Sequence, residues 1–365
     1  MTNALKSQIS ESAIQKIQQR FQQVYGFSIS PPVPIELETF SLMQRVHALA
    51  NTFAHALAQR FDLEDRKTYR EVIARLPEVV EGLPDMVQLI FPQMIVVWGL
   101  KRPQALEESL KGLQQLTALY TSEFAMRQFI VEYGEQERLW SFLQQLTQSS
   151  NPHHRRLASE STRPRLPWAS HLPLTIAHPE KSLEMLQPLW EDSHPYVRKS
   201  VANHLNDQLK FNRNWTYQIL QKWAKNPSPA TQWIVKQALR NALKAGEWQA
   251  YQILGYPPAQ AFTVQNWQWQ VTQTEGGWQF GFQGEIRNNG HRALKLRLDW
   301  RLQWRTLAGK ISEKTVKGLE ANVEANAPLM FNKTLNLKGQ AYQNLAEVMQ
   351  VQLQVNGKIN GKIIE

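Results

Sequence analysis

The chain of 365 residues contains no cysteine, which removes several kinds of site at once. Without thiols there is no disulfide, no thiolate-bound zinc and no cysteine nucleophile. The sequence also lacks a glycine-rich phosphate loop, a serine nucleophile elbow and a dinucleotide-binding pattern. Its nine histidines never stand at metal-ligand spacing with a carboxylate and a second histidine on one helix face. We therefore expect no metal and no organic cofactor.

Long apolar runs are absent as well. The longest, at 89–100, is interrupted by Pro92 and Gln93 and is shorter than the about 20 residues that cross a bilayer. Residues 1–21 have no continuous apolar core of the kind that a signal peptide needs. We expect a protein of the cytoplasm with no membrane partner.

Positive charge is in excess, with a formal net charge of +10. Such a balance favours polyanionic partners, and nucleic acid is the commonest of these. General solubility charge is the plainer alternative. The length of the chain predicts two domains, each large enough to bury its own core.

Helical periodicity fills the first two thirds of the sequence. Between Ser41 and Arg60, Leu42, Val46, Leu49 and their successors recur on one side of a helix. Similar patterns cover 70–76, 84–100, 105–120, 123–133 and 135–146.

Three proline turns reveal a repeat. Asn151-Pro152, His194-Pro195 and Ser228-Pro229 each precede a helix, at separations of about 43 and 34 residues, which suit two-helix repeats. We predict an all-α HEAT-like-repeat solenoid over residues 1–255. Successive second helices line the concave face of such a solenoid, so Glu160 and Asn203 are expected to be neighbours.

Past Gly255 the hydrophobic pattern changes from helical spacing to a period of two residues. Segments 262–271, 278–286, 294–304, 327–335 and 347–355 alternate apolar and polar residues, as strands do. Asn-Gly pairs at 289–290 and 356–357 predict hairpin turns, because both residues tolerate positive φ. In 294–304, Lys295, Arg297, Asp299 and Arg301 share the face predicted to point outward. About seven strands predict a smaller all-β immunoglobulin-like sandwich over 256–365.

Cations gather between residues 153 and 210. Arginines and helix N-termini along one concave face would form a track for a phosphate backbone, since both offer hydrogen-bond donors and positive potential. A solvated charged face is the competing interpretation. The residues that we assign to DNA binding are Arg155, Arg156, Arg163, Arg165, Arg198, Lys199 and Lys210.

Carboxylates stand inside this basic track at Glu123, Glu160, Asp207 and, with less support, Asp192. A carboxylate that faces a polyanion opposes binding, so it is expected only where it stabilises a cation or orients a water.

Structural roles for these carboxylates compete with the catalytic ones. Glu123 can favour the N-terminus of a helix. Asp207 can pair with Arg198 or Lys210, and Glu160 can pair with Arg163.

Trp168 differs from most of the 13 tryptophans, which stand at apolar positions of helices or strands. Pro167 fixes its approach, and Arg163, Pro164 and Arg165 precede it, which suits a stacking platform for a base or sugar. A ring wedged between two helices is the alternative.

These segments resemble a known family, the HEAT-like-repeat DNA glycosylases of alkylation repair, and within it the AlkC type. The resemblance is carried by TSEFAMRQFI at 121–130, RRLASESTRPRLPWA at 155–169 and EDSHPYVRKSVANHLND at 191–207. It implies a monofunctional glycosylase that excises cationic alkylated bases, chiefly 3-methyladenine and 3-methylcytosine, from double-stranded DNA in base excision repair.

The resemblance also implies roles for individual residues. The family's catalytic carboxylates match Glu160, Asp207 and Glu123, and its lesion-binding aromatic matches Trp168. One departure is Ser161, where the family pattern has a glycine. We expect a monomer.

A non-catalytic HEAT-repeat scaffold that binds DNA or protein is the alternative function. The carboxylates discriminate between the two, because a scaffold for DNA gains nothing from negative charge inside a basic groove, whereas stabilisation of a cation requires it.

Overall fold

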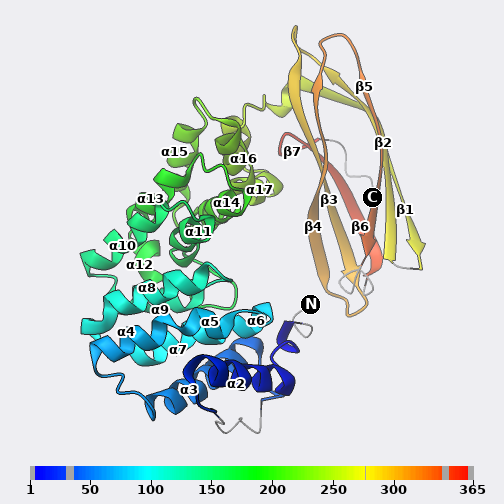
Figure 1. The fold of residues 1–365 in the computed structure, drawn as a ribbon. Helices are drawn as coiled ribbons and strands as arrows, with labels where there is room; N and C mark the ends of the chain where they lie inside the picture. The colour runs from blue at the N-terminus through cyan, green and yellow to red at the C-terminus, as the bar shows by residue number, and fades with distance from the viewer. Residues whose placement is uncertain (1–4, 30–36, 276, 339–344, 361–365) are drawn as a thin grey trace. The chain divides into compact units, whose positions relative to one another are not determined.

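The computed structural model describes residues 5–29, 37–275, 277–338 and 345–360. The chain forms two compact units, of which the first holds the residues up to Thr216 together with Ser228–Ile234, and the second holds Tyr217–Pro227 and the residues from Val235 onward. A helical part precedes a part made of antiparallel strands, as the sequence predicts (Figure 1).

Helices make up the first two thirds of the chain. In chain order they are α2 Glu11–Tyr25, α3 Leu42–Ala58, α4 Arg66–Ala74, α5 Leu76–Val80, α6 Asp85–Gln88, α7 Ile90–Gly99, α8 Leu106–Thr117, α9 Glu123–Tyr133, α10 Glu137–Thr147, α11 Pro152–Ser161, α12 Pro173–Ala177, α13 Pro179–Leu186, α14 Pro195–Phe211, α15 Arg213–Trp223, α16 Pro229–Ala238, α17 Arg240–Lys244 and α18 Trp248–Ile253. Within the described ranges, none is long and apolar enough to cross a membrane.

One predicted helix is divided. The pattern at 84–100 becomes α6 and α7, which meet at Leu89. Pro92 has no N–H to donate to the carbonyl of Gln88, so the hydrogen-bond ladder fails there, and the proline falls in the first turn of α7, where it is tolerated.

The proline turns mark the repeats. Helices α11, α14 and α16 begin at Pro152, Pro195 and Pro229, and the side chain of Asn151 caps α11 by accepting from the N–H of His153 at 2.9 Å. Helix α10 packs on α11, α11 packs on α14 of the next repeat, and α9 lies on the other side of α11. This stacking places α9, α11 and α14 side by side.

Seven strands form two antiparallel sheets in the second unit. The strands are β1 Phe262–Thr274, β2 Gly277–Asn288, β3 Leu294–Thr306, β4 Ile311–Val323, β5 Leu329–Lys338, β6 Leu345–Val355 and β7 Lys358–Asn360. One sheet has the order β1-β2-β5 and the other the order β4-β3-β6-β7. Phe282 of the first stacks on Trp300 of the second, with ring centroids 4.3 Å apart, so the two sheets share one core. The immunoglobulin-like topology and the boundary at 255/256 stay predictions.

The two Asn-Gly turns differ. Asn356 and Gly357 both have positive φ and join β6 to β7, which pair as a hairpin, so this prediction is confirmed. The hairpin predicted at 289–290 is wrong, because β2 pairs with β1 and β5 whereas β3 pairs with β4 and β6. The connection crosses between sheets, and the side chain of Asn288 supports it by donating to the carbonyls of Arg292 and Val323 at 2.7 and 2.8 Å.

The predicted outer face of β3 is also wrong in part. Arg297 and Asp299 are buried and form an ion pair with N–O distances of 2.7 and 2.9 Å. Tyr251 of α18 donates to Asp299 at 3.3 Å, so a helix of the same unit lies against this part of the strand. Alternation alone does not reveal that both faces of a strand are covered.

Candidate active site

Five charged side chains meet in a buried ion network within the first unit. Glu123 begins α9, Arg156 and Glu160 lie one turn apart on α11, Arg163 follows the end of α11, and Asp207 lies on α14. None of the five side chains is more than 14% exposed. We call this set the ion network; it joins three helices of successive repeats.

Arg163 holds the two central carboxylates. Its Nη1 donates to Oε1 of Glu160 at 2.6 Å, while Nη2 and Nε donate to Oδ2 of Asp207 at 2.6 and 3.0 Å. The pairing of Glu160 with Arg163, which the sequence offers as a structural role for Glu160, is therefore present. The alternative pairing of Asp207 with Arg198 or Lys210 is wrong, because Asp207 lies on the buried face of α14 that is turned toward α11.

Glu160 is held from both sides. Its Oε2 accepts from the hydroxyl of Ser200 on α14 at 2.6 Å, and Nη2 of Arg156 lies 3.6 Å from Oε1. Burial raises the pKa of Glu160, but Arg156, Arg163 and Ser200 together outweigh burial, and the pKa lies below its ordinary value of 4.5. Glu160 is therefore ionised at neutral pH.

Glu123 and Arg156 close the other end of the network. Nη2 and Nη1 of Arg156 lie 3.2 and 3.3 Å from the two carboxylate oxygens of Glu123, and the guanidinium stacks 4.5 Å above the ring of Tyr196. Burial lowers the pKa of Arg156, but Glu123 and Glu160 more than compensate and raise it. Three carboxylates and two guanidinium groups leave the ion network with a formal charge of −1.

The seven predicted DNA-binding residues fall into three groups, of which Arg155 and Arg198 form the third. Arg165, Lys199 and Lys210 are exposed, as a phosphate contact requires. Arg156 and Arg163 are committed to carboxylates of the ion network. The role of the whole set in DNA binding stays a prediction.

Arg155 and Arg198 organise the loop before α14. Nε and Nη2 of Arg155 donate to the two oxygens of Asp192 at 2.6 and 3.1 Å, and Asp192 also accepts from the backbone N–H of His194 at 2.8 Å. Arg198 donates to the carbonyl of Ser193 at 2.7 Å. Asp192 thus has a structural partner and stands apart from the ion network.

Trp168 is 46% exposed, which excludes a ring wedged between helices. Its φ is 63°, in the left-handed region that costs a residue with a side chain about 1–2 kcal/mol. The ring stacks on Phe124, which follows Glu123 in the chain, with centroids 6.3 Å apart and an interplanar angle of 28°. The ring is thus held at the surface by a strained backbone and by Phe124, and its role in lesion binding stays a prediction.

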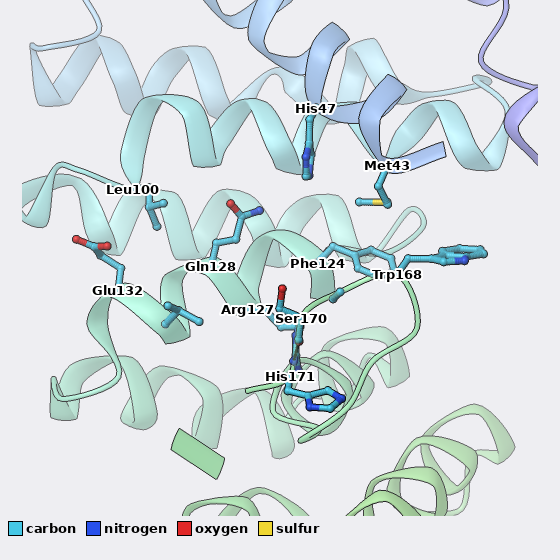
Figure 2. A pocket seen from close by; sticks show the side chains of 12 residues that line it. Met43, His47, Leu100, Phe124, Arg127, Gln128, Glu132, Trp168, Ser170 and His171 are labelled. Carbon is cyan, nitrogen blue, oxygen red and sulfur yellow. Dashed lines mark hydrogen bonds between the residues drawn. The ribbon is translucent and has the colours of Figure 1, made fainter. Parts of the chain in front are cut away.

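A cavity of about 450 Å³ lies beside Trp168 (Figure 2). Apolar side chains line most of it, among them Met43, Phe124 and Val131, and Arg127 also lines it. None of the three carboxylates of the ion network lines it. Figure 2 shows the ring of Trp168 directed away from the middle of the cavity.

Several residues of the site are missing from the sequence prediction. Arg127, Ser200 and Tyr196 contact the ion network or the loop that follows α11, and each stands inside one of the three quoted segments. Helical spacing was an available signal, because Arg127 follows Glu123 by one turn. His204 is fully buried, its Nδ1 lies 2.9 Å from the carbonyl oxygen of Ser159, and burial lowers its pKa to about 3, so it is neutral.

The described residues contain no group of three or more histidine, aspartate or glutamate side chains placed to hold a metal ion. The absence of a cofactor stays a prediction.

No family model matches the chain. An uncharacterized protein of Bacillus subtilis, YhaZ, is 32% identical over 272 residues, which are 74% of each chain. The structure of an alkylpurine DNA glycosylase of Pseudomonas fluorescens, AlkC, bound to DNA with an abasic site analog, is 25% identical with a TM-score of 0.82, over 98% of this chain and 97% of that one.

Proposed function

This chain belongs to the family of HEAT-like-repeat DNA glycosylases, AlkC type, and we propose that it excises cationic alkylated bases from double-stranded DNA. The observation that carries the proposal is the ion network. In a chain with a formal charge of +10, three carboxylates lie together in this buried network. Such a site suits a cationic intermediate.

The proposed chemistry needs no general acid. Methylation at N3 of adenine or cytosine makes the base a cation, so it leaves as a neutral molecule when the N-glycosidic bond breaks. The bonding electrons leave with the base, and the positive charge passes to the deoxyribose. Glu160, which is ionised at neutral pH, stabilises this oxocarbenium-like sugar electrostatically.

Asp207 is the group that orients the attacking water. Both hydrogen bonds from Arg163 end on Oδ2 of Asp207, and Oδ1 takes no part in them. Oδ1 accepts from the water that attacks the anomeric carbon and takes its proton as the new C–O bond forms. Glu123 acts indirectly. Its two carboxylate oxygens position the guanidinium of Arg156, which in turn lies beside Glu160.

The lesions follow from the same reasoning. We propose 3-methyladenine and 3-methylcytosine as substrates. A neutral lesion such as O6-methylguanine would need protonation to leave, and the depressed pKa of Glu160 makes it a poor proton donor. Ser161 is fully buried, and its hydroxyl donates to the carbonyl of Leu157 at 2.7 Å, so the departure from glycine presents no side chain to DNA.

We assign the contacts with DNA phosphates to the exposed cations Arg165, Lys199 and Lys210. Each contact to a phosphate releases a counterion, so affinity is expected to fall with salt. The protein acts as a monomer in the cytoplasm.

Replacement of Trp168 by alanine is expected to lower excision about 10-fold to 100-fold, because stacking of a base on an aromatic ring contributes about 1–3 kcal/mol. Initial rates on methylated DNA measure the effect. Trp248→Ala is the matched control, since Trp248 is 39% exposed but lies in the second unit. Equal rates for Trp168→Ala and wild type would remove Trp168 from the proposed site.

Release of free bases tests the proposed function. DNA treated with a methylating agent is incubated with the wild-type protein and a chelator, and the released bases are identified by mass spectrometry. We expect 3-methyladenine and 3-methylcytosine, with no release of O6-methylguanine. A protein that binds this DNA in a salt-sensitive manner but releases no base would be the scaffold.

A further inference from the structure

Arg127 is a buried cation without a carboxylate partner among the described residues. It lies on α9 and is 4% exposed. Its guanidinium donates only to backbone carbonyls, through Nη1 to Ser161 at 3.2 Å and Arg163 at 2.5 Å, and through Nη2 to Ser170 at 2.6 Å. Burial lowers its pKa to about 10, which still leaves it charged at neutral pH.

One of the three carbonyls belongs to Ser161, the last residue of α11, and the other two lie near the two ends of the loop that follows. Residues 162–171 leave α11 and return toward α12, and the loop is closed by the bond from the N–H of Leu172 to the carbonyl of Pro164 at 2.9 Å. Arg127 joins the start of this loop to its end. Figure 2 shows Arg127 extending from α9 toward Ser170, with Trp168 on the same loop.

The loop carries residues of both parts of the proposed site, namely the arginine that orients the catalytic carboxylates and the aromatic residue proposed to bind the lesion. Arg163 stands at its start, and the side chain of Arg163 orients Glu160 and Asp207 while its carbonyl is held by Arg127. Trp168 stands near its end in a strained left-handed conformation, which persists only when the surroundings impose it. Phe124 supports the ring of Trp168 from α9, the helix that also carries Arg127.

We propose that Arg127 is a positioning residue of the glycosylase reaction: it fixes loop 162–171 so that Arg163 aligns the catalytic carboxylates while Trp168 is held at the lesion. This inference rests on the proposed function. It assigns to Arg127 no contact with substrate: the role of Arg127 lies in the three bonds from its Nη1 and Nη2 to backbone carbonyls of Ser161, Arg163 and Ser170.

The chain offers a matched control. Arg45 is also buried, at 7% exposure, and donates only to carbonyls, those of Lys6, Ile9, Glu38 and Phe40. It fixes the segments before α2 and before α3, neither of which contributes to the ion network. Arg45→Met removes a guanidinium of the same kind and so reports the general cost to folding.

The first readout is catalytic. In Arg127→Met we expect kcat to fall about 100-fold with little change in KM, as for a displaced catalytic group. Arg127→Lys should recover most of that loss, since an ammonium has three donors for the same carbonyls.

In a Trp168→Ala background the same Arg127→Met change should lower kcat much less, because the two act through one loop. Arg45→Met should lower the melting temperature and leave kcat unchanged. A kcat loss in Arg45→Met equal to that in Arg127→Met, or full additivity with Trp168→Ala, would overturn the proposal.

The second readout does not depend on activity. Hydrogen–deuterium exchange of the intact protein should show faster exchange of loop 162–171 in Arg127→Met, with α14 unchanged. Unchanged exchange in the loop overturns the proposal even if kcat falls. A wild-type protein that releases no base overturns the proposed function and the catalytic role of Arg127 with it. Loop exchange then decides separately whether Arg127 holds the loop.

Discussion

Glu160→Gln is expected to lower excision of 3-methyladenine about 100-fold to 1,000-fold, the cost of removing one electrostatic group aimed at the transition state. Glutamine keeps the size of Glu160 and one oxygen that can accept from Ser200 or Arg163, but it removes the negative charge. Affinity for DNA with an abasic-site analogue should be unchanged or higher, because a charge that repels phosphate is gone. Single-turnover rates and a binding titration separate the two effects.

Glu108→Gln is the control for this change. Glu108 is 6% exposed, lies on α8 of the same unit and pairs with Arg66 at 2.6 Å, so it is a buried glutamate outside the ion network. We expect its variant to excise at the wild-type rate. A Glu160→Gln protein that keeps full activity would refute the electrostatic role of Glu160.

Arg163→Met is expected to destabilise the protein by about 3–5 kcal/mol, since loss of one partner from a buried ion pair leaves an uncompensated charge. Here two carboxylates, Glu160 and Asp207, lose the guanidinium they share. Equilibrium unfolding by urea measures the change. Adding Glu160→Gln to Arg163→Met should restore part of the lost free energy, because it removes one of the two unpaired charges. If the double variant is less stable than the single one by the full cost of Glu160→Gln alone, the residues are not coupled.

In the Arg163→Met variant, the contribution of Glu160 to the pH dependence of stability should reverse its sign. In the wild type the pKa of Glu160 is lower in the folded than in the unfolded state, so its contribution is present above the unfolded value of 4.5 and is lost as pH falls through the folded pKa. Without Arg163, burial and the nearby Asp207 should raise the folded pKa of Glu160. The variant should then gain stability relative to wild type as the pH is lowered, and a parallel decrease in both proteins would contradict the assigned role.

Periodicity and proline placement predicted the helical part well. The range 123–133 matches α9, and the prolines 152, 195 and 229 begin α11, α14 and α16. These signals are local, since a proline at a helix start and an apolar stripe each involve only neighbouring residues. The sequence gives no clear strand pattern for β4, because ISEKTVKGLEANV at 311–323 is rich in charge and only Val323 of it is buried.

Partners across repeats were harder to predict. The position of Glu123, Glu160 and Asp207 inside a basic track indicates a functional role, because negative charge there opposes binding of a polyanion. Their pairing through Arg156 and Arg163 depends on how α9, α11 and α14 stack, which a single sequence does not specify. The contact of Tyr251 with Asp299 of β3 could not be predicted for the same reason, because it joins residues 48 positions apart.

The catalytic role of Glu160 and Asp207 is tested by comparing base release by the wild type and by the double variant Glu160→Gln/Asp207→Asn. The substrate is DNA treated with a methylating agent, and a chelator is present throughout. We expect free 3-methyladenine and 3-methylcytosine from the wild type, almost none from the variant, and binding of the variant to DNA that is as tight as that of the wild type or tighter. Release by the variant at the wild-type rate would contradict the central claim that these carboxylates carry the reaction.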